Sequence, residues 1–247
     1  MTLRIDYQAP RYTTLSLTES EVRERLTQVW KRDRFPRLID TDLNAGSRTD
    51  NPYWAIVRLM RHEPEAWGDP WAVDQFGDDT PLRRSMVQTY AWSIPSPADV
   101  QWMHRILGGR DVVEIGAGSG YWAWQLRQLG VDVDAVDDSS WTRPWAKQWS
   151  PVRKGGPKDA ALHPDRALLL VWPPYDDAMA YRSLTAYEGD LVFYAGEGFY
   201  GCTADDQFHH ELEKSWELVG TAPHHPTFDG IHCRLYAYRR NGSGVTA

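Results

Sequence analysis

One segment sets the architecture of this chain: Val112-Val113-Glu114-Ile115-Gly116-Ala117-Gly118-Ser119-Gly120-Tyr121. A short apolar run leads into three alternating glycines, and apolar residues at helical spacing (Trp122, Leu126 and Leu129) follow. This order predicts a buried strand, a tight turn and a helix. Glycines in such a turn permit positive φ and let a ligand approach the backbone, and the start of the helix offers free N–H groups to an anionic ligand.

Helices and strands alternate on both sides of this segment. Ser96 is a good N-cap and Pro97 a good first helical residue, and Gly108-Gly109 ends the helix that they predict. Further helices are predicted at 121–129, 141–149, 178–187 and 203–216. Further strands are predicted at 131–136, 152–153, 167–171, 191–194, 218–222 and 233–238. This alternation predicts an α/β fold with a parallel sheet.

An acidic residue, Asp137, ends the strand that follows the glycine turn, where it can bind both hydroxyls of a ribose. The sequence therefore predicts a nucleoside-containing ligand at the carboxyl edge of the sheet. A dinucleotide site favours the spacing G-x-G-x-x-G, but its third glycine would fall on Tyr121. The spacing here is instead E-x-G-x-G-x-G.

This spacing resembles the first motif of class I S-adenosylmethionine-dependent methyltransferases, and the resemblance extends over about residues 97–240. It implies a seven-stranded mixed sheet of the class I methyltransferase type, closed by a hairpin of the strands at 218–222 and 233–239, and S-adenosylmethionine as the cofactor. It also implies that Glu114 lies near the methionine amino group and that Asp137 binds the ribose. The glycines that would pass under the methionine and ribose are Gly116, Gly118 and Gly120.

The fourth strand of the predicted sheet runs into Trp172-Pro173-Pro174-Tyr175. Amine-methylating members of the family have Asn or Asp here, then two prolines and an aromatic residue that stacks on the substrate. Trp172 departs from that pattern, because an indole N–H donates a hydrogen bond and cannot accept one. We assign Trp172 to the cofactor site, Pro173, Pro174 and Tyr175 to substrate binding, and a catalytic contact to Tyr175; a plain turn is the alternative.

A general base helps methyl transfer only when the nucleophile arrives protonated. The candidates are Glu197, after the fifth strand, and the pair His224-His225, of which we assign Glu197 to catalysis and His225 to substrate binding. The alternatives are that Glu197 is only an acidic residue near the start of a helix, and that the two histidines are solvated loop residues. The residue that recognises adenine is unassigned, with Asp159 as a guess. No metal site is expected, because the adjacent Asp176 and Asp177 more simply cap the next helix.

The first 96 residues form a separate region with predicted helices at 18–32, 53–60 and 81–92. We interpret 1–96 as a helical cap or lid over a cofactor-binding domain at 97–240, with a frayed tail at 241–247. Tyr90 and Trp92 lie shortly before that domain, where they could close over the cofactor or pack in the core.

The composition limits the classes of partner that the chain is expected to bind. Hydrophobic residues make up 42% and the formal net charge is −7, so the chain is globular and its overall field does not favour nucleic acid or anionic membranes. Two cysteines, no signal-like N-terminus and no long apolar stretch indicate a cytoplasmic protein. A homodimer is compatible with such a fold, although nothing in the sequence indicates one.

The function that these residues favour is S-adenosylmethionine-dependent methyl transfer to an oxygen or nitrogen of a small molecule. The alternatives are a cofactor-binding protein of the same fold that does not methylate, another reaction such as a cyclisation, and an NAD-dependent oxidoreductase.

Overall fold

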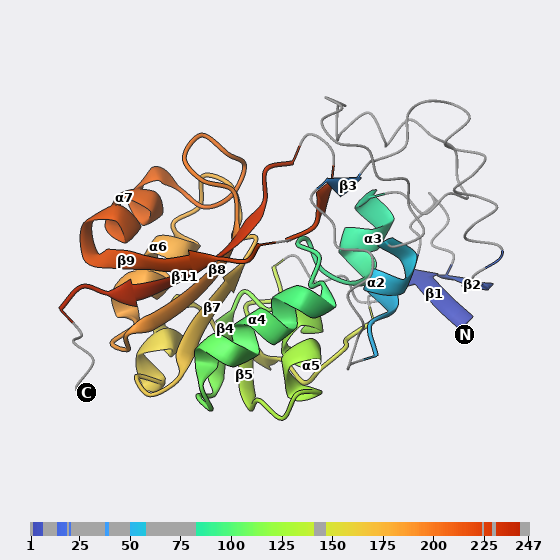
Figure 1. Cartoon of the computed structure of the whole chain (residues 1–247), viewed down its shortest axis with the longest axis horizontal. Helices are drawn as coiled ribbons and strands as arrows, with labels where there is room; N and C mark the ends of the chain where they lie inside the picture. Colours follow the sequence, from blue (N-terminus) through green and yellow to red (C-terminus); the bar gives the residue numbers. More distant parts are fainter. Residues whose placement is uncertain are drawn as a thin grey trace.

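The structure is a computed structural model of the chain (Figure 1). It describes residues 2–6, 14–18, 20, 38–39, 50–57, 83–140, 147–223, 225–228 and 231–242. A layered α/β domain runs from α4 to β11. The elements from β1 to α3 lie beyond the end of the sheet at which its parallel strands finish.

The central sheet has seven strands in the order β6-β5-β4-β7-β8-β11-β9. Their bounds are β4 (Val112–Ile115), β5 (Val133–Asp137), β6 (Arg153–Lys154), β7 (Ala167–Val171), β8 (Leu191–Gly196), β9 (Trp216–Thr221) and β11 (Arg234–Arg240). The first five strands of that order are parallel, and β11 runs antiparallel between β8 and β9. The predicted mixed sheet with a closing hairpin is confirmed. Strands β4 and β8 are buried throughout, as the continuous apolar runs of a two-sided parallel sheet require.

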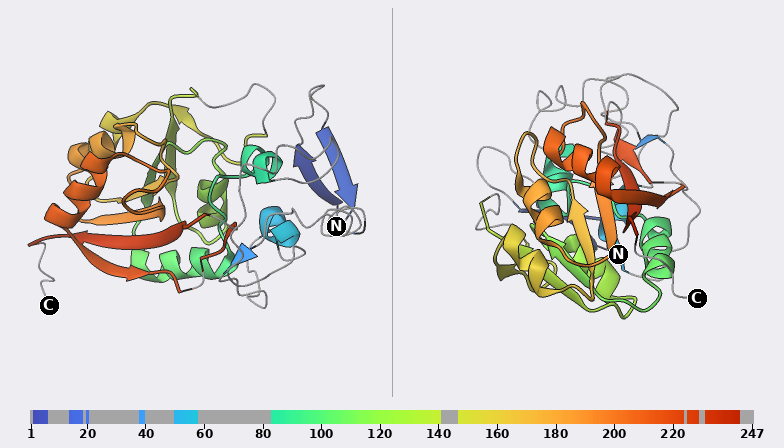
Figure 2. Two further views of the ribbon diagram at one scale, coloured as in Figure 1. Left: turned by 90° about the horizontal axis from the view of Figure 1, so that it is seen from above. Right: turned by 90° about the vertical axis from the view of Figure 1, so that its left-hand side faces the viewer.

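Helices cover both faces of the sheet, as the two views of Figure 2 show. On one face, a buried cluster joins the sheet to α4 (Pro97–Leu107) and α5 (Tyr121–Arg127). On the other face, a second cluster joins it to the 3₁₀ helix η2 (Pro157–Leu162), α6 (Met179–Ala186) and α7 (Asp206–Ser215). Because every crossover helix buries an apolar stripe, the sheet is a hydrophobic layer between two helical layers.

Helix α4 begins where the sequence predicts. The Asp99 N–H donates to Ser96 Oγ at 3.1 Å, and the Ser96 N–H donates to Asp99 Oδ2 at 3.1 Å, which together form a capping box. Gly108 ends the helix with a left-handed φ of 57°. The local cap signals therefore fixed both ends of this helix.

The N-terminal region contains helix α2 (Pro52–Val57), which begins one residue before the second predicted helix, and helix α3 (Arg83–Thr89), which lies within the third. It also contains an unpredicted hairpin of β1 (Thr2–Asp6) and β2 (Thr14–Thr18). Beyond Thr18, which ends β2, and Ser20, the predicted helix at 18–32 lies outside the described residues. So do 243–247 of the tail and 141–146, while 147–149 are not helical.

A third buried cluster joins the N-terminal region to the α/β domain. The segment between β9 and β11 leaves the sheet, and its strand β10 (Thr227–Phe228) pairs with β3 (Leu38–Ile39). The aromatic members of the cluster are Tyr53, Trp54, Tyr90, Tyr121 and Phe228. We call the described residues 50–57 and 83–95 the cap, since this cluster packs them against the carboxyl edge of the sheet. Among the described residues, no helix is long and apolar enough to cross a membrane.

Candidate functional site

The glycine turn links β4 to α5, and all three of its glycines have positive φ. At Gly120 a Cβ atom would lie 2.9 Å from Val152 Cγ2 and 3.1 Å from the Ser150 carbonyl, so packing alone requires a glycine there. At Gly118 a Cβ atom would meet nothing within 4 Å. The turn therefore faces open space at Gly118, where a ligand can approach the backbone.

Glu114 lies directly before this turn and is buried, with 1% of its surface exposed. Its Oε2 atom is buried and has no hydrogen-bond partner. Burial raises the pKa of Glu114 to about 8, because a carboxylate loses its hydration there. A cationic ligand beside Oε2 would supply the missing partner, so this carboxyl fits the amino group of S-adenosylmethionine.

Asp137 lies across the glycine turn from Glu114. Parallel pairing of Ile115 with Val136 brings the ends of β4 and β5 together. The Gly118 N–H donates to Asp137 Oδ2 at 2.8 Å, and the Ser139 N–H donates to Oδ1 at 2.7 Å. The structure thus brings together Glu114, the three glycines and Asp137, which the sequence had placed in one cofactor site.

Trp172 directly follows β7 at the same edge, and its backbone N–H donates to the Ala195 carbonyl of β8 at 2.7 Å. Its indole stacks on Trp92 of the cap, with ring centroids 6.2 Å apart and planes at 17°. Tyr90 instead packs inside the cap, stacked on Tyr53 at 4.8 Å. Of the two aromatic residues before α4, Trp92 therefore borders the site and Tyr90 belongs to the core.

The two prolines and Tyr175 follow Trp172 in a fixed loop. The Ala204 N–H donates to the Pro173 carbonyl at 3.1 Å, and the Asp176 N–H donates to the Ala204 carbonyl at 3.0 Å. The Pro173 carbonyl is therefore already bonded, while the Tyr175 side chain is 69% exposed. The carbonyl that would hold an amine in the amine-methylating pattern is engaged within the protein.

Backbone strain is concentrated in the loops that follow the parallel strands. Among the described residues, the non-glycine positions with positive φ are Ser139 after β5, Trp172 and Asp176 after β7, and Tyr200 and Ala204 after β8. Left-handed conformations are unfavourable for such side chains and persist where the surrounding structure imposes them, often at functional sites. The strain thus marks the same edge as the glycine turn.

Glu197 follows β8 and is 5% exposed. The Cys202 N–H donates to its Oε2 at 2.7 Å, and the His232 N–H donates to its Oε1 at 2.6 Å. Burial tends to raise the pKa of Glu197, but these two N–H groups hold it below its usual value. Glu197 is therefore an ionised carboxylate that connects the loop after β8 to the residues before β11.

His232 is a functional candidate that comes from the structure and not from the sequence. Its side chain is 66% exposed, and its Nδ1 lies 3.9 Å from Glu197 Oε1. The only sequence signal for it is its place directly before the last strand, at the carboxyl edge of the sheet.

His225 is fully buried, so its interpretation as a solvated loop residue is wrong. Its Nδ1 lies 3.0 Å from Asp99 Oδ2, and its Nε2 lies 3.0 Å from Ser93 Oγ and 3.4 Å from Cys233 Sγ. Burial opposes its charge, but the Asp99 carboxylate raises the pKa of His225 to about 10. This buried cluster connects α4, the cap and the segment before β11. His224 lies outside the described residues.

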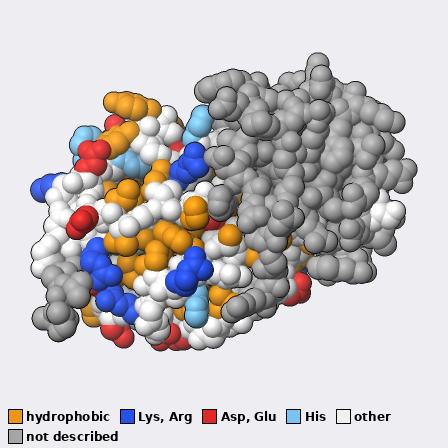
Figure 3. Space-filling view, viewed as in Figure 1, with side chains coloured by type: hydrophobic (Ala, Val, Ile, Leu, Met, Phe, Trp, Pro, Cys, Tyr) orange, Lys and Arg blue, Asp and Glu red, His pale blue; other side chains and the backbone are white. Residues whose placement is uncertain are grey.

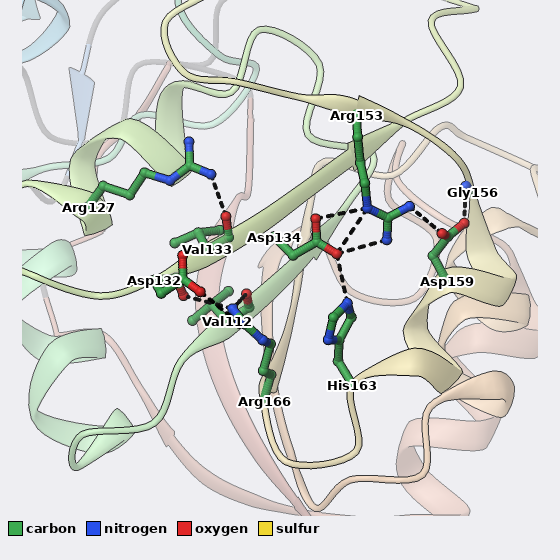
Figure 4. Close-up of polar contacts among 10 residues, drawn as sticks. All are labelled: Val112, Arg127, Asp132, Val133, Asp134, Arg153, Gly156, Asp159, His163 and Arg166. Carbon is green, nitrogen blue, oxygen red and sulfur yellow. Dashed lines mark hydrogen bonds and ion pairs between the residues drawn. The ribbon is translucent and has the colours of Figure 1, made fainter.

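Asp159, the guess for adenine, belongs to a network that fixes strand β6 (Figure 4). Its Oδ2 accepts the Gly156 N–H at 2.8 Å, and its Oδ1 pairs with Arg153. Arg153 also binds Asp134 through two nitrogens, and His163 Nε2 lies 2.7 Å from Asp134 Oδ2. These contacts give Asp159 a structural role in holding β6 and η2 together. Adenine recognition stays unassigned. Among the described residues, no three His, Cys, Asp or Glu side chains could hold a metal ion.

Comparison with known proteins gives short or distant likenesses. No protein-family model matches the chain. It is 40% identical over 58 residues to ribosomal RNA large subunit methyltransferase M of Marinobacter nauticus, covering 24% of this chain and 16% of that protein. The protein of the same name from Pseudomonas fluorescens is 38% identical over 64 residues, covering 26% and 18%. The chain thus spans less than a fifth of the length of these curated relatives.

Among solved structures, the magnesium protoporphyrin IX methyltransferase of Synechocystis, with bound S-adenosylmethionine, has 11% identity and a TM-score of 0.41, over 70% of this chain and 90% of that one. The central sheet of this chain has seven strands and closes with an antiparallel hairpin, which is the arrangement implied by the resemblance of the glycine turn to the class I methyltransferases. By these features, the chain has the fold of the class I S-adenosylmethionine-dependent methyltransferases.

Proposed function

We propose that the chain binds S-adenosylmethionine at its glycine turn and transfers the methyl group to an oxygen or nitrogen of a small molecule. One observation supports this above the others. Glu114 Oε2 is buried without a partner directly before a turn that faces open space at Gly118. A buried acceptor left without a partner is costly, and a cationic ligand relieves that cost.

The residues present fit this cofactor. Glu114 would accept hydrogen bonds from the methionine amino group, and the glycine turn would pass beneath the methionine and ribose. Asp137 would bind the ribose hydroxyls, exchanging its bond from the Gly118 N–H for bonds to the ligand. When bound, S-adenosylmethionine supplies a methyl group already activated on a positively charged sulfur. The protein then has chiefly to align the acceptor with that methyl group.

The acceptor would lie between the cap and the loops after β7 and β8. The stacked Trp92 and Trp172 offer a flat apolar wall, which suits a planar ring. Tyr175, which is exposed, would contact the acceptor beside Pro173 and Pro174. His225 has both ring nitrogens engaged inside the protein, so we propose that it positions the cap. Glu197, bound by two backbone N–H groups, would act through His232.

Calorimetry with S-adenosylmethionine, S-adenosylhomocysteine and NAD tests the cofactor. We expect micromolar binding of the first two, and a loss of about 100-fold in Asp137→Ala, because two hydrogen bonds to a charged group disappear. Asp138→Asn is the matched control, because Asp138 bonds to the nearby Ser140, whose N–H donates to its Oδ1 at 2.7 Å. Binding of NAD alone would show that the glycine turn is the dinucleotide site of an NAD-dependent oxidoreductase.

The similarity to the two ribosomal RNA large subunit methyltransferases favours a second candidate, methylation of ribosomal RNA. The net charge of −7 opposes it, since RNA binding relies on Lys and Arg contacts to phosphate. On the described part of the face in Figure 3, Lys and Arg side chains lie apart in small groups, and hydrophobic side chains occupy the centre. Labelled S-adenosylmethionine offered with large-subunit RNA or with a metabolite pool separates the candidates. Cofactor binding without transfer to either would support a non-methylating protein.

A further inference from the structure

We propose that the acceptor group is a hydroxyl and that His232, held beside the Glu197 carboxylate, removes its proton. This inference rests on the proposed methyl transfer. It assigns the acceptor chemistry and a general base that the glycine turn, Asp137 and the Trp172 loop do not provide.

The topology places this pair at the edge where the reaction would occur. Antiparallel pairing of Arg234 with Gly196 brings the residues before β11 beside those after β8. Glu197 directly follows Gly196, and His232 lies two residues before Arg234. The Trp172 N–H bonds to Ala195 on the same strand end. The pair therefore lies one strand beyond Trp172 at the same edge of the sheet.

The two members of the pair have the exposures that a base and its supporting carboxylate need. Glu197 is buried and bound by two backbone N–H groups, so its position and its negative charge are fixed. The His232 imidazole is exposed, and its Nδ1 lies 3.9 Å from Glu197 Oε1. A fixed carboxylate at this distance stabilises the imidazolium that forms when the ring takes a proton.

The loop after β7 disfavours an amine acceptor. The amine-methylating pattern has the acceptor side chain of Asn or Asp at this position, but the Trp172 indole can only donate, and the Ala204 N–H takes one of the two lone pairs of the Pro173 carbonyl. A hydroxyl differs from an amine because it is a weak nucleophile until its proton leaves, so a base is required. The donor-only side chain at Trp172 and the presence of a base thus point to the same substrate class.

The step balances with the groups named. The acceptor oxygen forms a bond to the methyl carbon as the carbon–sulfur bond breaks, and the electron pair of that bond stays on sulfur. The hydroxyl proton passes to a ring nitrogen of His232 and then to water. The products are a methyl ether, S-adenosylhomocysteine and one proton.

The first test needs no cofactor or acceptor. Side-chain NMR of histidine-labelled protein reports on the ring of His232, with His232→Asn to assign the signal. If Glu197 lies against that ring, Glu197→Gln should change the imidazole chemical shifts at a fixed pH. Glu188→Gln, which removes an exposed acid elsewhere, should leave them unchanged. Unchanged shifts in Glu197→Gln would overturn the pairing, and circular dichroism of each variant shows that it is folded.

The second test separates a base from a structural histidine. Phenol, 4-nitrophenol and aniline are offered as probes with S-adenosylmethionine. His232→Asn should slow methylation of phenol by about 100-fold or more, and of the more acidic 4-nitrophenol much less. Equal slowing of both phenols, or methylation of aniline but of neither phenol, would contradict the proposal. Calorimetry on the same samples should show that His232→Asn binds S-adenosylmethionine as the wild-type protein does. If the wild-type protein itself did not bind S-adenosylmethionine, the proposed function would fail, rather than the assignment of His232 alone.

Discussion

The two ends of the parallel strands are built differently. At the amino ends, charges are paired: Asp190 before β8 binds Arg110 and Arg239, and Asp132 before β5 binds Arg166. The left-handed positions there belong to glycines, Gly108 and Gly109 before β4 and Gly130 before β5.

At the carboxyl ends, charged groups and left-handed backbone positions are accommodated less favourably. Left-handed positions fall on Trp172, Tyr200 and other non-glycine residues, and Glu114 Oε2 is buried without a partner. The amino end shows what this chain does when only stability is at stake. The departures at the carboxyl end therefore indicate a surface shaped for a ligand.

The largest difference should appear on removing one charge at each end. Asp99→Asn leaves the buried His225 imidazolium without its counter-ion, and we expect a loss of about 3–5 kcal/mol in the free energy of unfolding. Asp132→Asn removes a partner of Arg166 that is 65% exposed, and should cost less than about 1 kcal/mol. Urea denaturation followed by tryptophan fluorescence measures both. Equal losses would mean that the buried pair is not charged.

The response of stability to pH should also differ between the ends. Because the pKa of Glu114 is raised to about 8, the native carboxyl keeps a proton that the unfolded chain loses above about pH 4.5. The free energy of unfolding should then fall as pH rises toward 8, by up to about 1.4 kcal/mol per pH unit, and Glu114→Gln should flatten this slope.

Asp190 gives the opposite sign and serves as the control. Burial tends to raise its pKa, but Arg110 and Arg239 hold it below its usual value. Its contribution to stability is present above about pH 4 and disappears as the solution becomes more acidic. Asp190→Asn should therefore remove part of the loss at acid pH and leave the slope between pH 4.5 and 8 unchanged. A slope that survives in Glu114→Gln would assign it to another group.

The smallest effect on stability is expected at two glycines that both have a left-handed backbone and open space beside the Cα atom. Gly118 and Gly130 have φ values of 52° and 85°, and neither would bring a Cβ atom within 4 Å of other atoms. Alanine at either position should cost about 1 kcal/mol, from the left-handed backbone alone. Only Gly118→Ala should weaken S-adenosylmethionine binding, by about 10-fold or more, because its methyl group enters the space left for the ligand. Weakening by Gly130→Ala as well would show that loop strain, rather than contact, controls binding.

Local signals account for what the sequence predicted correctly. Strands β4 and β7 are short apolar runs, and the Ser96 cap defines α4, so neighbouring residues were sufficient. The meeting of Asp137 with the glycine turn also followed, because consecutive parallel strands end at the same edge.

Contacts between distant segments account for what was missed. The His225 cluster joins Ser93 to Cys233, which are 140 residues apart, and no periodic pattern predicts such a contact. His232 gains its neighbour only because β11 pairs with β8. The β1–β2 hairpin lies in a region that was interpreted from its helical spacing alone.

The two hydrogen bonds that join Pro173 and Asp176 to Ala204 make the loops after β7 and β8 one rigid floor. Neither loop can swing aside without breaking bonds to the other. Trp92 of the cap stacks on Trp172, which leads into the first of these loops, so the cap completes one wall above this floor. A substitution in the cap that displaces Trp92 would therefore change the shape of the proposed acceptor site without altering either loop.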